Sequence, residues 1–100
     1  MHVELIVAPE AKLDIAEAYI WYECRRAGLG EEFLSSVDAC LEGIRRWLGM
    51  YAAIHEDFRR ALIRRFPYTI FYEQLPATVT IYAVFHTSRD PDKWRRRLSG

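Results

Sequence analysis

The sequence predicts an α+β domain in which a pair of helices packs on one face of a four-stranded, mainly antiparallel sheet. Two short runs, residues 68–73 and 78–86, alternate apolar with polar side chains around a turn, which is typical of an antiparallel hairpin. Upstream, residues 9–26 and 31–48 carry apolar side chains at helical spacing. The chain has 100 residues, 51% of them hydrophobic, which suffices for one core, so we expect a single domain over residues 1–100.

The first strand is predicted over residues 2–8, which are rich in β-branched side chains. Pro9 follows, at a place where the first turn of a helix tolerates proline. The helical pattern then continues to about Arg26, ahead of Gly28 and Gly30. Its apolar stripe consists of Leu13, Ala16, Ile20 and Cys24, widened by Ile15, Tyr19 and Tyr22. We therefore expect this helix to be covered on more than one side.

The second helix has the clearest periodicity in the chain. Glu31 and Glu32 at its start, and Arg45 and Arg46 near its end, complement the helix dipole. Its apolar positions fall on one face, and they are Phe33, Val37, Cys40, Leu41, Ile44 and Leu48. The two helices are expected to form an antiparallel pair whose joint apolar face needs a sheet to pack on.

The second half is expected to hold three strands and a short helix, giving the order β-α-α-β-β-β-α. Residues 47–57 show no clear period and are expected to form a loop, or a loose extra turn at 50–54. Residues 58–65 are expected to form the strand before the hairpin, and residues 90–97 a short helix capped by Asp90. The first strand most simply pairs with the last one.

The alternation in the last strand predicts which of its side chains face the core. The expected core-facing set is Val79, Ile81, Ala83 and Phe85, and the set on the opposite face is Thr80, Tyr82, Val84 and His86. With the helix pair on one face of the sheet, the other face is expected to stay open.

Composition narrows the class of protein. The chain holds no apolar run of the ~18 residues that a membrane span needs, and its N-terminus lacks the layout of a signal peptide, so we expect a cytoplasmic protein. The net charge is zero, but residues 1–50 carry 5 basic and 9 acidic side chains and residues 51–100 carry 9 and 5. An anionic partner would be steered to the second half. The same charges can equally serve only to keep the surface solvated.

No metal, cofactor or disulfide is predicted. On an antiparallel helix pair, Cys24 and Cys40 would be offset by ~9 Å along the axis, which is beyond disulfide reach, so both are expected to be reduced core residues. The three histidines, His2, His55 and His86, show no metal-ligand spacing with them.

Few side chains in this sequence suit catalysis. A metal-independent ribonuclease needs groups that accept and donate a proton, and cations that stabilise the charged transition state. His86 could carry a proton, Arg65 and Arg89 could supply the cations, and Tyr72 or Tyr82 could stack on a base. Each of these residues can instead have a structural role: His86 as a hydrogen-bonded residue at the end of a strand, and an arginine as one half of an ion pair.

Several stretches carry a family resemblance over nearly the whole chain. They are residues 14–18 with Trp21 and Tyr22, then Gly30 with Phe33, then residues 65–72, and finally residues 84–97. In this order they resemble the RelE/ParE superfamily of type II toxin–antitoxin toxins, and more closely its ParE-like branch. The resemblance implies a small toxin encoded with an antitoxin, whose C-terminal segment wraps the toxin and blocks it.

The resemblance leaves two targets open. RelE-like members cleave mRNA on the ribosome, which would use Arg65, His86 and Arg89 here, whereas ParE-like members poison DNA gyrase. Trp94 stands where RelE-like toxins place a tyrosine, and it has no ionisable proton to give, so gyrase inhibition is favoured. An inactive relative that only binds an antitoxin is a third alternative. The expected contact residues for target or antitoxin are Tyr19, Tyr22, Tyr72, Tyr82, Trp94, Arg95, Arg96 and Arg97.

Overall fold

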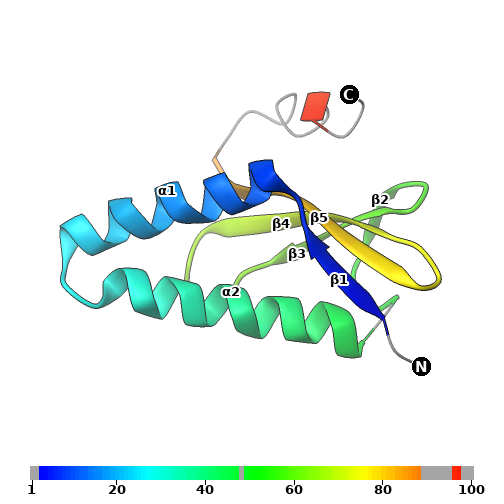
Figure 1. Ribbon diagram of the computed structural model, residues 1–100, viewed down its shortest axis with the longest axis horizontal. Helices are drawn as coiled ribbons and strands as arrows, with labels where there is room; N and C mark the ends of the chain where they lie inside the picture. Colours follow the sequence, from blue (N-terminus) through cyan, green and yellow to red (C-terminus); the bar gives the residue numbers. More distant parts are fainter. Residues whose placement is uncertain (1–2, 48, 89–95, 98–100) are drawn as a thin grey trace.

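Two helices lie on one face of a five-stranded sheet (Figure 1). The computed structural model describes residues 3–47, 49–88 and 96–97. The elements are β1 (Glu4–Val7), α1 (Pro9–Arg25), α2 (Leu29–Arg46), β2 (Ala53–His55), β3 (Phe58–Leu62), β4 (Tyr68–Gln74) and β5 (Thr78–His86). The predicted α+β class and the order of these elements are confirmed, but the sheet has five strands rather than four. The helix expected over residues 90–97 lies outside the described residues, except for Arg96 and Arg97.

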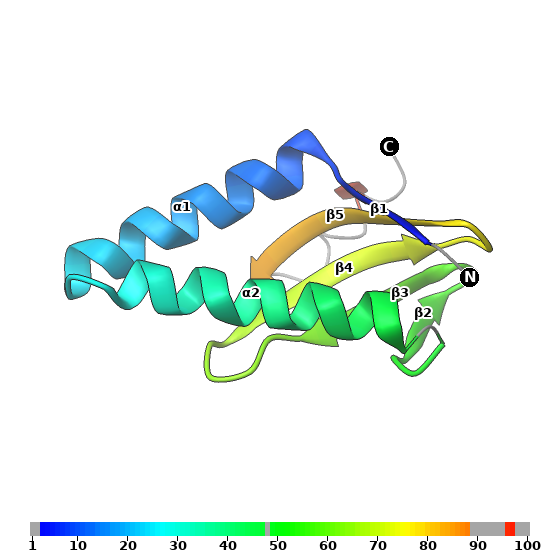
Figure 2. The ribbon, with the colours of Figure 1, turned by 60° about the horizontal axis from the view of Figure 1, so that its bottom comes forward.

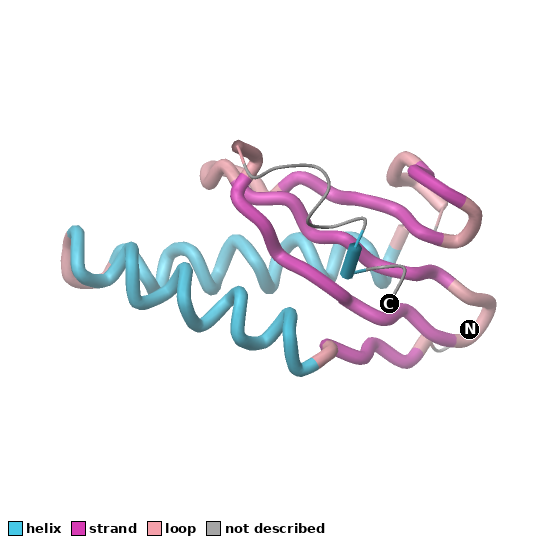
Figure 3. The backbone as a smooth tube through the Cα atoms, turned by 90° about the horizontal axis from the view of Figure 1, so that it is seen from above, coloured by secondary structure: helices cyan, strands magenta, loops and turns pink. Residues whose placement is uncertain are grey.

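The strands follow the order β1-β5-β4-β3-β2 across the sheet (Figure 3). β1 runs parallel to β5, with Leu5 opposite Val79, so the predicted pairing of the first strand with the last is confirmed. All other neighbouring strands are antiparallel. The first and last strands in the sequence, β1 and β5, thus lie side by side in the sheet.

The fifth strand, β2, is the element that the sequence pattern missed. Ala53 lies opposite Arg59 of β3, and the Arg60 N–H donates to the Ala52 carbonyl oxygen at 3.3 Å. The expectation of a loop or helical turn up to Ile54 is therefore wrong. A strand of three residues is too short to show alternation, and only its pairing with β3 defines it.

A bulge in β5 changes which of its side chains face the helices. Phe71 pairs with Ala83 but the next residue, Tyr72, pairs with Ile81, so Tyr82 is the extra residue. Beyond this point the faces switch. Val79, Ile81 and Val84 belong to the core under the helices, whereas Ala83 and Phe85 pack with Phe71 on the opposite face. The predicted faces of Ala83, Val84 and Phe85 are therefore wrong.

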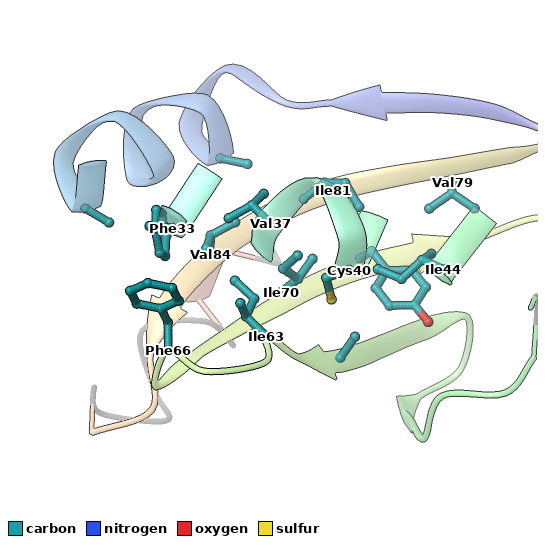
Figure 4. Close-up of a cluster of buried hydrophobic side chains, with 14 of the residues drawn as sticks. Phe33, Val37, Cys40, Ile44, Ile63, Phe66, Ile70, Val79, Ile81 and Val84 are labelled. Carbon is teal, nitrogen blue, oxygen red and sulfur yellow. The ribbon is translucent and has the colours of Figure 1, made fainter. Parts of the chain in front are cut away.

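The main core lies between the helix pair and the sheet (Figure 4). Side chains of α2, of β4 and β5, and of the segment joining β3 to β4 meet there, among them Phe33, Val37, Cys40, Ile44, Ile63, Phe66, Ile70, Val79, Ile81 and Val84. At one end, the rings of Tyr22, Phe33, Phe66 and Tyr68 contact one another with centroids 4.9 to 6.1 Å apart. This aromatic cluster joins the tip of the helix hairpin to the β3–β4 connection.

The buried face of α1 is only partly the predicted one, since Ile15 and Tyr22 belong to the core as expected but Leu13, Ile20 and Cys24 do not. Ala11, Ala18 and Tyr22 are buried, while Leu13 and Ile20 are 63% and 59% exposed and Cys24 is exposed as well. α1 carries two apolar stripes: Ala11, Ala18 and Tyr22 are buried with Ile15 packed against the core, and Leu13 and Ile20 are exposed. Spacing alone does not show which of two apolar stripes is buried. The prediction that Cys24 is a core residue is wrong, whereas Cys40 is buried as expected.

Candidate functional site

His86 ends β5 on the helix side of the sheet, because the bulge has turned it away from the predicted open face. Its ring packs edge-on against Tyr68 at 5.2 Å, and the Ser88 N–H donates to its Nδ1 atom at 3.1 Å. The imidazole is exposed and lines a cavity of about 520 Å³. The rest of this α1–β5 cavity is formed by Asp14, Glu17, Ala18, Trp21, Tyr22, Pro67, Tyr68, Val84 and Ser88.

Arg65 lies at a different cavity. Arg65 lies in the turn after β3, where its backbone has a φ of 73°. Its guanidinium donates a hydrogen bond to Glu32 on α2 at 3.0 Å. It lines a second cavity of about 720 Å³, between α2 and β3. Glu32 also accepts a 2.8 Å hydrogen bond from Arg26, and the bond from Arg26 and then that from Arg65 lower the pKa of its carboxyl. Arg65 and His86 thus line separate cavities, and Arg89 lies outside the described residues.

The four tyrosines expected to make contacts differ in exposure. Tyr22 is buried in the aromatic cluster, and Tyr72 is 1% exposed. The Tyr72 hydroxyl has no hydrogen-bond partner within the described ranges, and burial raises its pKa to about 12. Tyr22 contributes only to the wall of the α1–β5 cavity, and Tyr72 offers no surface for a stacking contact in this conformation.

Tyr19 and Tyr82 are partly accessible. The Tyr19 hydroxyl donates to Glu31 at 3.2 Å, and this bond raises the pKa of the phenol. Tyr82 lies on the face opposite the helices, where its hydroxyl donates to Glu73 and its ring lies 5.9 Å from that of Phe58. Burial is the main cause that raises the pKa of Tyr82. These two rings lie on different surfaces of the molecule.

Arg97 is held by Asp14, a residue of the motif at 14–18 to which the sequence analysis gives no contact role. Its guanidinium donates to the Asp14 carboxylate at 2.7 Å and to the Tyr82 carbonyl oxygen at 3.4 Å, and it lies 4.7 Å from the centre of the Phe85 ring. Arg96 is exposed. Trp94 and Arg95, the other predicted contact residues of this segment, lie outside the described residues.

The face of the sheet opposite the helices is not open as expected. Phe71, Ala83 and Phe85 are buried there, and the Arg97 guanidinium lies over the Phe85 ring. One accessible apolar surface lies on α1. Leu13, Ile20 and Trp21, which we call the α1 outer surface, are 52% to 63% exposed, and the Arg25 guanidinium lies 4.1 Å from the Trp21 ring centre.

The part of the chain that the structure describes has neither a candidate metal site nor a candidate membrane span. None of its groups of histidine, cysteine and carboxylate side chains could hold a metal ion. None of its helices is long and apolar enough to cross a membrane.

Comparison with known proteins identifies the family. The model of the ParE toxin of type II toxin–antitoxin systems, parDE, matches residues 5–91. The chain belongs to the ParE toxin family. A solved structure described as the chromosomal ParDE toxin–antitoxin system from P. aeruginosa matches this ParE-family fold with a TM-score of 0.69. The identity is 13%, and the match covers 84% of this chain and 95% of the other. None of the curated proteins compared with this chain matches its sequence.

The family assignment confirms the resemblance to RelE/ParE toxins that the sequence motifs indicate. The chain thus belongs to a family of toxins of type II toxin–antitoxin systems. The motif residues themselves have structural roles: Tyr22, Phe33 and Phe66 form the aromatic cluster, and Gly30 lets the two helices approach closely.

Proposed function

We propose that this ParE-family toxin inhibits DNA gyrase by direct protein contact, without making or breaking a covalent bond. The observation that supports this choice of target is the separation of Arg65 from His86. Acid–base cleavage of RNA needs a proton carrier and a cation at one phosphate. Here His86 lines the cavity beside α1, whereas Arg65 is paired with Glu32 at the cavity beside α2. Gyrase is a cytoplasmic enzyme, so the proposal places the toxin there.

Ribosome-dependent mRNA cleavage is the second candidate. The observation in its favour is that His86 is exposed at the end of β5 and receives a hydrogen bond from the Ser88 N–H, which fixes its ring. On this alternative the catalytic set would be Arg65, His86 and Arg89.

Expression of the toxin without its antitoxin separates the two candidates. We expect growth arrest with filamentous cells and DNA breaks, and loss of supercoiling by purified gyrase when purified toxin is added. His86→Ala is expected to retain this activity within about twofold, since the proposal gives this exposed side chain no chemical role. Arrest of translation with cleaved mRNA, abolished by His86→Ala in a protein that is still folded, would contradict the proposal.

The antitoxin is proposed to cover the α1 outer surface with an amphipathic helix. Leu13, Ile20 and Trp21 form an exposed apolar strip along a helix, which is the arrangement that a partner helix covers. Single exposed apolar side chains are common on protein surfaces, but three large ones together on one helix are typical of an interaction site. The unbound toxin is thus expected to be complete as a fold but uncovered along α1.

Ile20→Glu tests this contact. The variant is expected to fold with a stability within about 0.5 kcal/mol of the wild type, because Ile20 is exposed, and to bind the antitoxin at least tenfold more weakly. Leu75→Glu, an equivalent change at an exposed leucine in the β4–β5 turn, is the matched control and is expected to bind normally. Calorimetric titration with the antitoxin measures both. If the two variants bind the antitoxin with equal affinity, the α1 outer surface is not part of the interface.

A further inference from the structure

The α1–β5 cavity has an aromatic and acidic lining. It lies where α1 passes the end of β5, and the β3–β4 connection reaches the same end of the sheet (Figure 2). Its volume of about 520 Å³ falls within the range of small-molecule sites, roughly 300–1,000 Å³. Among the described residues that line it, two are carboxylates and none is a lysine or an arginine. Such a lining repels a phosphate group and attracts a cation.

Three rings form a continuous wall of this cavity. The Trp21 ring packs edge-on against Tyr22 with centroids 5.0 Å apart, and the Tyr22 ring lies 6.1 Å from that of Tyr68. Trp21 is 52% exposed and Tyr68 is partly exposed, whereas Tyr22 is buried and supports the other two. The electron-rich face of an aromatic ring attracts a cation, and indole does so best. The Arg25 guanidinium, 4.1 Å from the Trp21 ring centre, shows that this indole already attracts one cation.

The two carboxylates of the cavity differ in what they bind within the fold. Asp14 accepts hydrogen bonds from the Val84 N–H and from the Arg97 guanidinium, so its charge is already compensated. Glu17 is exposed and forms no salt bridge within the described part of the chain. Glu17 and Trp21 are four residues apart and are therefore neighbours on one face of α1. A cation in the cavity can thus contact a carboxylate and an indole together.

An arginine side chain suits this combination of groups. Its planar guanidinium can lie on a ring face and donate two hydrogen bonds to one carboxylate, which a lysine ammonium cannot do. Its alkyl part can pack on the apolar part of the lining, such as Ala18 and Val84. Trp21 and Pro67, which are exposed at the cavity, offer a protein surface further apolar contact. The cation is therefore expected to be carried by a protein rather than to be a free small molecule.

We propose that the α1–β5 cavity receives an arginine side chain from the surface of gyrase. Glu17 binds the guanidinium, and Trp21 and Tyr68 provide the ring faces. The inference rests on the proposed gyrase target and names the chemical group that the toxin recognises there. His86 makes no contact with the arginine side chain, so the expected activity of His86→Ala is unchanged.

The first test uses the full-length toxin and a small probe. Nα-acetyl-arginine methylamide is compared by NMR titration with Nα-acetyl-citrulline methylamide, which has the same shape without the charge. We expect the arginine probe to shift the Trp21 indole signal and to bind about fivefold or more tightly than the citrulline probe. Equal binding of the two probes, or no binding of the arginine probe, would overturn the cation site. Tighter binding of spermidine than of the arginine probe would overturn the assignment to a protein side chain.

The second test measures binding of purified gyrase to toxin variants. Glu17→Lys reverses the charge at the cavity, and Asp38→Lys makes the same charge change at an exposed position of α2 outside it. We expect Glu17→Lys to raise the Kd roughly tenfold at moderate salt and Asp38→Lys to stay within about twofold. Glu17→Gln, which keeps the size of the side chain but not its charge, is expected to fall between the two. Circular dichroism establishes that each variant is folded.

The two tests together distinguish failure of this inference from failure of the proposed target. If the wild-type toxin binds gyrase but Glu17→Lys binds it as tightly as Asp38→Lys, gyrase does not use the cavity and the inference is wrong. If the wild type binds the arginine probe but not gyrase, the gyrase target is wrong and the cation site stands. Binding of both, with the loss confined to the Glu17 variants, supports the inference.

Discussion

Asp14 joins three parts of the molecule that are far apart in sequence. It lies in α1, accepts a hydrogen bond from the Val84 N–H of β5 at 3.0 Å, and binds the Arg97 guanidinium at 2.7 Å. Its side chain is 10% exposed and that of Arg97 is 27% exposed, so little water competes for these bonds. In the sequence, Asp14 belongs to the motif of residues 14–18, but the helical pattern there gives it no role. Asp14 has this role because β5 and the residues after it lie beside α1 in the fold, and the local sequence around Asp14 does not show that.

Replacement of Asp14 tests this role. Asp14→Ala is expected to lower the free energy of unfolding by about 2–4 kcal/mol, since it leaves a partly buried guanidinium and a strand N–H without their shared acceptor. Glu17→Ala, one turn further along α1 at an exposed position, is expected to change it by less than about 0.5 kcal/mol. Denaturant titration measures both, and similar losses for the two variants would contradict the assigned role.

At the scale of elements, the helix hairpin depends on a close approach at Gly30. The N–H groups of Gly28 and Gly30 both donate to the Glu23 carboxylate at 2.9 Å, which ties the start of α2 to the end of α1. A Cβ atom at Gly30 would lie 2.8 Å from the Glu23 carboxylate and from the Tyr19 ring. Gly28 has a φ of 90°, which glycine adopts without strain.

Gly30→Ala is expected to destabilise the toxin by about 1–3 kcal/mol, because Tyr19 and Glu23 must both move to admit the methyl group. Gly49→Ala provides a contrast. A Cβ atom there meets nothing within 4 Å, so only its φ of 85° opposes the change, at a cost of about 1 kcal/mol. Thermal unfolding of the two variants measures the difference. A smaller loss for Gly30→Ala than for Gly49→Ala would refute the close-approach argument.

The elements also show what the sequence can predict. α2 was predictable because its apolar residues occupy a single face, and Phe33, Val37 and Ile44 are indeed buried. α1 was only partly predictable because it has two apolar stripes, one buried and one exposed. β2 and the bulge at Tyr82 were not predictable, since each is defined by pairing between strands. For the candidate site, the bulge had the largest effect, because it moved His86 to the helix side.

At the scale of the whole molecule, buried tyrosine hydroxyls couple stability to alkaline pH. Burial raises the pKa of Tyr72 to about 12, whereas an unfolded tyrosine titrates near 10. The unfolded state therefore loses its proton first. Up to about pH 10 the group does not alter stability, and as pH rises from there to about 12 the folded state is progressively disfavoured.

Burial also raises the pKa of the Cys40 thiol, to about 11, so we expect the free energy of unfolding to begin to fall near pH 9 and to fall further between about pH 10 and 12. Tyr72→Phe is expected to make this fall shallower and, at neutral pH, to cost little, because the hydroxyl that it removes has no partner among the described residues. Urea titrations at several pH values measure both effects. An equally steep fall in Tyr72→Phe would assign the pH dependence to other groups.

The parallel pairing of β1 with β5 has a consequence for synthesis of the toxin in the cell. Residues 4–7 leave the ribosome early, yet their partners, residues 78–81, are translated only after some seventy intervening residues. Until then the first strand has no neighbour, and long-range pairing of this kind forms late. The growing chain is therefore expected to remain harmless for most of its translation, which gives an antitoxin already present time to meet the toxin as it folds.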